Sequence, residues 1–210
     1  MNLDLAPLAP PKRLAVAYAR GPQKQALIVL LLFDVMLGGI FYKNSEPILA
    51  QLRMAWWRDV IAKAPADRPS GEPLIAHLSG LQMAYPDWNV ERRMLGLIDG
   101  WDELMTGDIW DDAVIGRHID ARARAIFCGF GAIYPRGEGD DLAQLGRDWA
   151  LSDLRSYCRD GAQMVAVHAF PRVRAGRLPA HIPRALAILE RSARDHLSPI
   201  ALFWHALTGR

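Results

Sequence analysis

Residues 31–61 read LLFDVMLGGIFYKNSEPILAQLRMAWWRDVI, and this stretch decides the fold class. Its first part belongs to an apolar run from Ala26 to Tyr42, which only Asp34 and two glycines interrupt. Glu46 and Pro47 suit the first turn of a second helix, which Ser45 is placed to cap. The stretch therefore predicts two consecutive helices joined by a short turn.

The apolar run admits two interpretations. Its 17 residues span about 25 Å as a helix, which is short of a bilayer core of about 30 Å. Asp34, near the middle, would cost roughly 3 kcal/mol in lipid. We therefore expect a helix buried in a soluble bundle, with a membrane-embedded or interfacial helix as the alternative. A buried Asp34 needs a partner, and Arg53 and Arg58 are candidates for a structural ion pair. Alternatively, Asp34 is a functional carboxylate in a pocket.

The second helix, expected from Ser45 to Lys63, carries apolar side chains on two faces. A helix of this kind is typically buried on both sides, so we expect Trp56, Trp57 or both to lie in the core. One face holds Leu49, Leu52, Trp56 and Val60. The other face holds Met54, Trp57 and Ile61.

The rest of the chain continues the helical pattern. Pro7, Pro10 and Pro11 indicate an extended N-terminal arm over residues 1–17, followed by a single helical domain over residues 18–210. No pair of strands with hairpin chemistry stands out, so the fold class is all-α. Helices are expected over Pro73–Met83, Val90–Met105, Ala113–Phe130, Leu142 past Tyr157, and Arg184–Leu207 with a break near Pro199.

Composition narrows the function classes. The net charge of +2 is too small to indicate a nucleic-acid partner, and no nucleic-acid-binding motif is present. Cys128 and Cys158 lie thirty positions apart and form no zinc or disulfide pattern, which favours a reducing cytoplasm. The six histidines show no metal-ligand spacing, and no phosphate-binding glycine loop or nucleophile elbow occurs.

Residues 31–61 resemble the N-terminal helices of squalene/phytoene synthase-like proteins. The likeness lies in a Phe followed by a polar residue, an S-E-P turn and a helix with the W-W-R-D motif at residues 56–59. More narrowly, it points to a divergent bacterial branch and a related mitochondrial complex I assembly factor. Two later segments resemble family segments in the same order: LGRDWALSDLR at residues 145–155 and GRLP at residues 176–179.

The resemblance implies an isoprenoid synthase-type bundle, truncated relative to active enzymes. Those enzymes hold Mg²⁺ between two aspartate-rich helical motifs and so neutralise a leaving diphosphate. By the family's spacing, the first motif falls near Phe41, Tyr42 and Ser45. The second falls at residues 156–160, where Ser156 and Arg159 replace acidic residues and only Asp160 remains. The resemblance therefore predicts that this site has lost most of its metal ligands.

A few residues remain as site candidates. Asp160 and Asp34 are the residual catalytic carboxylates, while Asp108 and Asp112 have i,i+4 spacing that suits either helix capping or a metal. Asp99 and Glu103 share that spacing but are expected to be solvated surface. Candidates for binding a diphosphate or another anionic ligand are Arg53, Arg58, Arg155 and Arg159.

We expect a noncatalytic member of this family, a pseudoenzyme with a binding or assembly role. It would hold a prenyl or lipid chain, or a protein partner, without a cofactor, in the cytoplasm or at the inner face of the membrane. The alternative is an active Mg²⁺-dependent head-to-head prenyltransferase whose carboxylates lie elsewhere. A third possibility is a peripheral membrane protein that uses its apolar helix.

Overall fold

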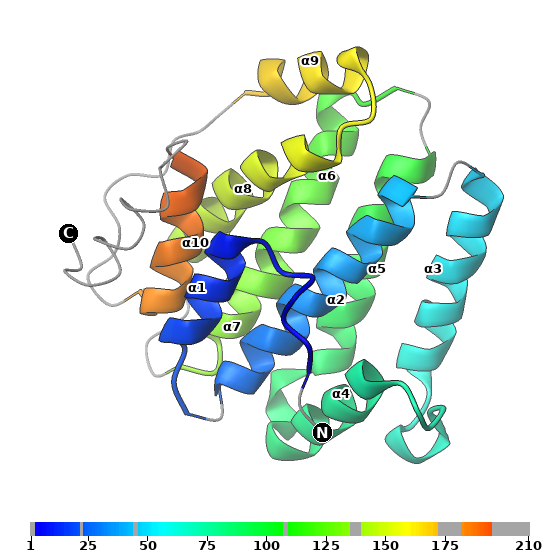
Figure 1. Ribbon diagram of the computed structural model, residues 1–210, viewed down its shortest axis with the longest axis vertical. Coiled ribbons are helices and arrows are strands. Elements are labelled where there is room, and N and C mark those ends of the chain that lie inside the picture. The colour runs from blue at the N-terminus through cyan, green and yellow to red at the C-terminus, as the bar shows by residue number, and fades with distance from the viewer. Residues whose placement is uncertain are drawn as a thin grey trace.

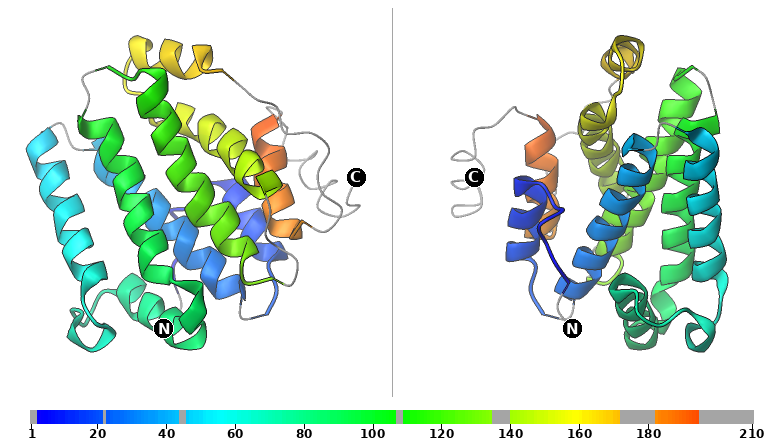
Figure 2. Two further views of the ribbon diagram at one scale, coloured as in Figure 1. Left: turned by 180° about the vertical axis from the view of Figure 1, so that it is seen from behind. Right: turned by 45° about the vertical axis from the view of Figure 1, so that its right-hand side comes forward.

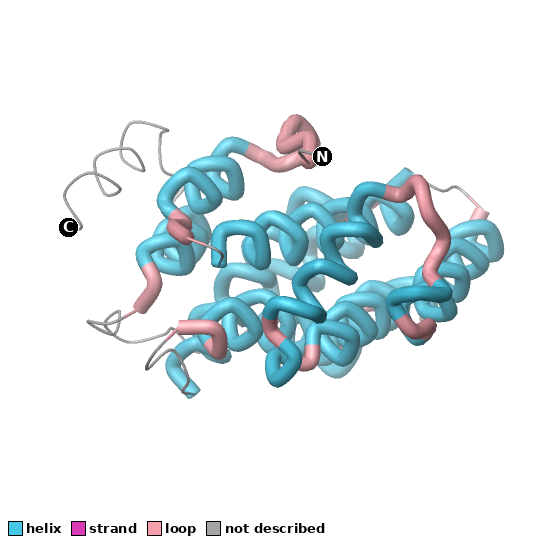
Figure 3. The backbone as a smooth tube through the Cα atoms, turned by 90° about the horizontal axis from the view of Figure 1, so that it is seen from below, coloured by secondary structure: helices cyan, strands magenta, loops and turns pink. Residues whose placement is uncertain are grey.

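The computed structural model describes residues 3–21, 23–43, 46–106, 109–134, 140–171 and 182–194. Within these ranges the secondary structure is helical and contains no strand (Figure 3). The all-α fold class is therefore confirmed. The main helices are α1 (Pro10–Tyr18), α2 (Gln23–Lys43), α3 (Pro47–Ala62), α4 (Pro73–Ala84), α5 (Val90–Thr106), α6 (Asp112–Arg122), α8 (Asp140–Leu154), α9 (Gly161–Ala169) and α10 (Arg184–Arg194).

Helix α2 runs through the middle of the bundle (Figure 1). Helices α5, α6 and α8 pack in series around it, α1 and α10 pair on one side, and α3 packs on α5 at the other side (Figures 1 and 2). Among the described helices, α2 is long and apolar enough to cross a membrane, but 72% of its most apolar window is buried inside the protein. The expectation of a helix buried in the bundle is thus confirmed.

Helix α6 continues into a π-helical segment, η3 (Ala123–Cys128), and a last turn, α7 (Gly129–Gly131). The predicted helix over Ala113–Phe130 is therefore continuous but changes its winding after Arg122. Its apolar residues Ile115, Ile119, Ile126 and Phe130 are buried, and Arg124 is exposed.

Three sequence expectations need correction. The N-terminal arm is not extended throughout, because α1 begins at Pro10, where a proline in the first turn costs no hydrogen bond. Helix α9 was not expected, and Asp160 caps it by accepting a bond from the Gln163 amide at 2.8 Å. Only one face of α3 is buried. The proposed Ser45 cap, the GRLP segment and the break near Pro199 lie outside the described residues.

Candidate functional site

Asp34 lies in an interior charge cluster, which we define as Lys12, Asp34, Arg122 and Asp153. Arg122 donates from Nε and Nη2 to the two Asp34 carboxylate oxygens at 2.8 and 2.7 Å, and both side chains are fully buried. Arg122 Nη2 also reaches Asp153 at 2.5 Å, and Lys12 Nζ lies 2.9 Å from the same carboxylate. Two cations and two carboxylates thus balance, as a buried group of charges requires.

The pairing corrects the sequence expectation for Asp34. An arginine is its partner, as expected, but this arginine is Arg122 rather than Arg53 or Arg58. Trp101 Nε1 adds a third bond to Asp34 at 3.0 Å. One signal in the sequence pointed to Arg122: it lies three residues after Ile119, on the apolar stripe of its helix, where an unpaired cation would be costly.

Neighbouring charges shift the pKa values of Asp153 and Arg122. Burial opposes the charge on Asp153, but Lys12 and Arg122 outweigh it and lower the pKa of Asp153 to about 2. Burial likewise opposes the charge on Arg122, yet Asp34 and Asp153 raise its pKa above the ordinary value. Asp153 and Arg122 therefore stay charged at neutral pH, so these two groups are poorly suited to exchange protons with a substrate.

His118 lies against this cluster and is uncharged. Its ring stacks edge-on against Trp101, and its Nδ1 lies 2.8 Å from the Gly100 carbonyl, so Nδ1 carries the proton. Nε2 is buried without a hydrogen-bond partner among the described residues. Burial and the neighbouring Arg122 lower the pKa of His118 to about 3.

The end of α2 faces the segment that follows α8. The Arg159 guanidinium lies 4.6 Å from the centre of the Phe41 ring, and the rings of Tyr42 and Tyr157 are 6.5 Å apart. Contact is close here because Gly38 has no side chain: a Cβ at this position would lie 2.5 Å from the Tyr157 ring. These are the two segments that the resemblance assigns to the metal motifs, but aromatic rings and an arginine meet there.

The carboxylate candidates do not converge. Asp112 begins α6 and is exposed, while its neighbour Asp111 caps that helix by accepting a bond from the Val114 amide at 2.8 Å. Asp160 caps α9, and Asp108 lies outside the described residues. Within the described ranges, no three Asp, Glu, His or Cys side chains gather as a metal ion would require.

The four candidate arginines also lie in different parts of the structure. Arg58 bonds Asp99 at 2.8 Å and approaches Asp102 at 3.4 Å on the surface between α3 and α5. Asp99 is therefore exposed surface, as expected, but it has a partner. Arg155 and Arg159 belong to the segment after α8, whereas Arg53 projects from α3 into a groove.

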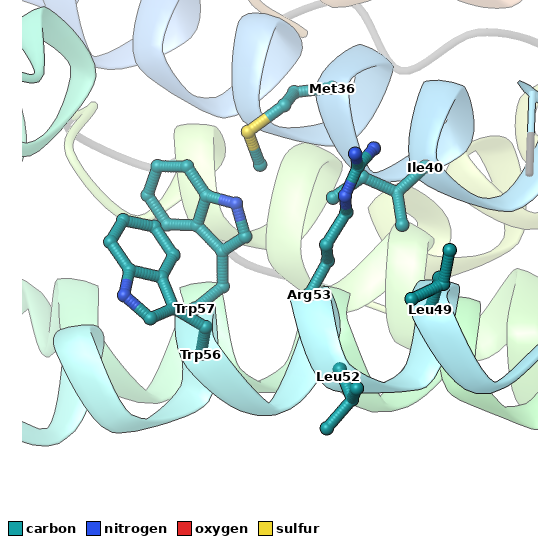
Figure 4. A pocket seen from close by; sticks show the side chains of 7 residues that line it. All are labelled: Met36, Ile40, Leu49, Leu52, Arg53, Trp56 and Trp57. Carbon is teal, nitrogen blue, oxygen red and sulfur yellow. The ribbon is translucent and has the colours of Figure 1, made fainter.

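This groove, of about 490 Å³, lies between α2 and α3 (Figure 4). Its volume falls in the range of about 300–1,000 Å³ that is usual for small-molecule sites. Arg53 extends from α3 toward α2, and in the described part of the chain it has no ion-pair or hydrogen-bond partner. The walls are otherwise apolar and comprise Met36, Ile40, Leu49, Leu52, Trp56 and Trp57.

The groove exposes a face of α3 that the sequence pattern predicted to be buried. Trp57 is buried, with its ring edge-on to Phe33 at 5.3 Å, as expected for one of the two tryptophans. Trp56 is 47% exposed, and Leu49 and Leu52 are 46% and 61% exposed. The face is apolar but has no helix packed over it in the described structure, so it can bind an apolar ligand.

We compared the chain with models of protein families, with curated proteins and with solved structures, and none of them matches.

Proposed function

We propose that this protein is a noncatalytic relative of the squalene/phytoene synthases that binds a prenyl or related lipid chain in the groove between α2 and α3. The observation that carries the proposal is a largely apolar groove that contains the guanidinium of Arg53, for which the described residues supply no ion-pair or hydrogen-bond partner. Apolar walls suit a hydrocarbon chain, and a guanidinium forms paired hydrogen bonds with a phosphate.

The family assignment draws support from the arrangement at the end of α2. The two segments that the resemblance pairs lie together through Phe41, Tyr42, Tyr157 and Arg159. In an active enzyme, carboxylates at such positions would hold the ions that stabilise a leaving diphosphate. The aromatic and cationic side chains here favour a binding role over the ionisation of a substrate.

An active, Mg²⁺-dependent prenyltransferase is the alternative that the test must distinguish. Farnesyl diphosphate serves as the probe, because it carries both the apolar chain and the anionic head. Isothermal titration should give saturable binding to the wild-type protein. We expect Arg53→Gln to weaken it about tenfold or more, since charge-assisted hydrogen bonds contribute about 1.5–3 kcal/mol. Leu49→Asp should weaken it further by placing a charge against the chain.

Met83→Asp is the matched control. Met83 is 76% exposed on α4 and does not line the groove. Binding that is unchanged in both Arg53→Gln and Leu49→Asp would exclude the groove as the site. Binding that requires Mg²⁺ and yields a condensed product would support the enzymatic alternative.

A further inference from the structure

Trp57 carries a polar group that the proposed function does not use. Its side chain is 6% exposed and lines the groove, with its ring edge-on to Phe33. A buried tryptophan usually donates its indole N–H to an acceptor, as three others in this chain do: Trp88, Trp101 and Trp110. Trp57 Nε1 has no acceptor among the described residues, and it is not one of the described polar atoms that are sealed from solvent without a partner. The group is therefore open to a ligand.

The indole N–H of Trp57 and the guanidinium of Arg53 are presented to the same part of the groove. Positions 53 and 57 lie one turn apart on α3, so their side chains are neighbours on one face of the helix. In Figure 4 the Trp57 nitrogen lies on the edge of the ring that faces Arg53, whereas the Trp56 nitrogen lies on the edge that faces away. Two donors of different kinds are thus available to one ligand group.

The charge of the groove selects the kind of group that these donors would bind. Of the described residues that line the groove, none is acidic, so the Arg53 charge is not neutralised there. A phosphate has several charged acceptor oxygens and can accept from the guanidinium and the indole at once, whereas an alcohol offers one uncharged oxygen. Because the groove has no carboxylate to hold Mg²⁺, it would bind the phosphate directly.

We propose that Trp57 determines head-group specificity: its Nε1–H and the Arg53 guanidinium together bind the phosphate of a prenyl phosphate or diphosphate, and so select phosphorylated isoprenoids over neutral ones. This inference rests on the proposed function, because it concerns the same groove. It adds a ligand class, a second polar contact and independence from a metal ion.

Trp57→Phe tests this role, because it keeps an aromatic ring against Phe33 and removes the N–H donor. Isothermal titration in the presence of EDTA measures the affinities for farnesyl phosphate and for farnesol. We expect the variant to lose about tenfold in affinity for farnesyl phosphate but about threefold or less for farnesol, since a hydrogen bond to a charged acceptor is about twice as strong as one to a neutral acceptor. Trp56→Phe is the matched control: it also lines the groove, and it should keep the wild-type preference.

Nuclear magnetic resonance of wild-type protein labelled at the tryptophan nitrogens gives a second readout that does not depend on the folding of a variant. The Trp57 Nε1–H signal, identified by its contacts with the Phe33 ring, should move downfield on addition of farnesyl phosphate and much less on addition of farnesol. The Trp101 signal is the internal control, because its N–H is bonded to Asp34 in the interior and should not move.

The possible outcomes separate this inference from the proposed function. A Trp57 signal that does not move at saturating farnesyl phosphate overturns the inference, as does a folded Trp57→Phe variant with the wild-type ratio of the two affinities, or wild-type binding that is lost in EDTA. If Arg53→Gln and Leu49→Asp still weaken binding in the first two cases, the proposed function stands without a role for Trp57. If wild-type protein binds neither compound, the proposed function fails and the inference fails with it.

Discussion

Arg122 and Asp34 form a bidentate ion pair at the centre of the bundle. The donor–acceptor distances are 2.8 and 2.7 Å, and neither side chain is exposed to solvent. The pair joins α2 to α6 across 88 positions of sequence. Rings of Trp101 and Trp149 lie 5.0 and 4.7 Å from the Arg122 guanidinium. The interior around Asp34 is thus filled by packed aromatic rings and paired charges.

Breaking this pair should be costly. Asp34→Ala leaves Arg122 buried with one carboxylate instead of two, and removal of one partner of a buried pair typically costs about 3–5 kcal/mol. Chemical denaturation monitored by circular dichroism measures the loss. Asp99→Ala is the matched control, because it removes an exposed partner of Arg58 and should cost less than about 1 kcal/mol. Equal losses in the two variants would mean that the interior pair contributes no more than a surface pair.

Acid should destabilise the protein through His118. The pKa of the buried ring is about 3, whereas the unfolded value is 6.5. Because the unfolded chain binds this proton more readily, the stability is complete above about pH 6.5 and falls as the pH drops toward 3, by at most about 1.4 kcal/mol per unit. Asp153 adds a further loss only below its unfolded value of about 4.

His118→Gln removes the titrating group and serves as the comparison. Urea unfolding at a series of pH values between 7 and 4 should show a falling free energy in the wild type and a flatter profile in this variant. Parallel profiles would show that His118 does not titrate differently in the folded and unfolded states.

The adjacent tryptophans of α3 should respond differently to truncation. Trp57 packs on Phe33 in the core, so Trp57→Ala should cost about 3–5 kcal/mol. Trp56 is 47% exposed at the groove, and Trp56→Ala should cost about 1 kcal/mol or less. Thermal or urea unfolding measures both. A larger loss of stability for Trp56→Ala than for Trp57→Ala would mean that α3 turns Trp56, and not Trp57, toward the core.

The apolar periodicity of the sequence predicted most of the helices because it reflects their burial in the bundle, but it missed α1 and α9. The same pattern failed at α3, because Leu49, Leu52 and Trp56 follow core spacing although they border a groove. Periodicity reports that a face is apolar, and it does not report what covers that face. The partner of Asp34 was missed for a related reason: the apolar stripe that carries Arg122 indicates that this arginine is buried, but local spacing does not indicate that it meets Asp34 of α2.

Prenyl condensation should be absent. In the described ranges no three potential ligands gather for a metal ion, and Arg159 and the aromatic residues near it occupy the positions where the resemblance places carboxylates. Incubation with labelled farnesyl diphosphate, Mg²⁺ and reduced nicotinamide, followed by extraction, should return no C30 product. Magnesium-dependent product that disappears in Asp108→Ala or Asp160→Ala would show that displaced carboxylates restore the activity.

The most direct test is a crystal structure with a non-ionising thiolo analogue of farnesyl diphosphate. We predict that the prenyl chain lies between α2 and α3, against Met36 and Trp56, with the diphosphate within hydrogen-bonding distance of Arg53. A chain located in the bundle interior around Asp34 and Trp101, with metal ions at the end of α2, would contradict it. So would an empty groove at a concentration of analogue that saturates the protein in solution.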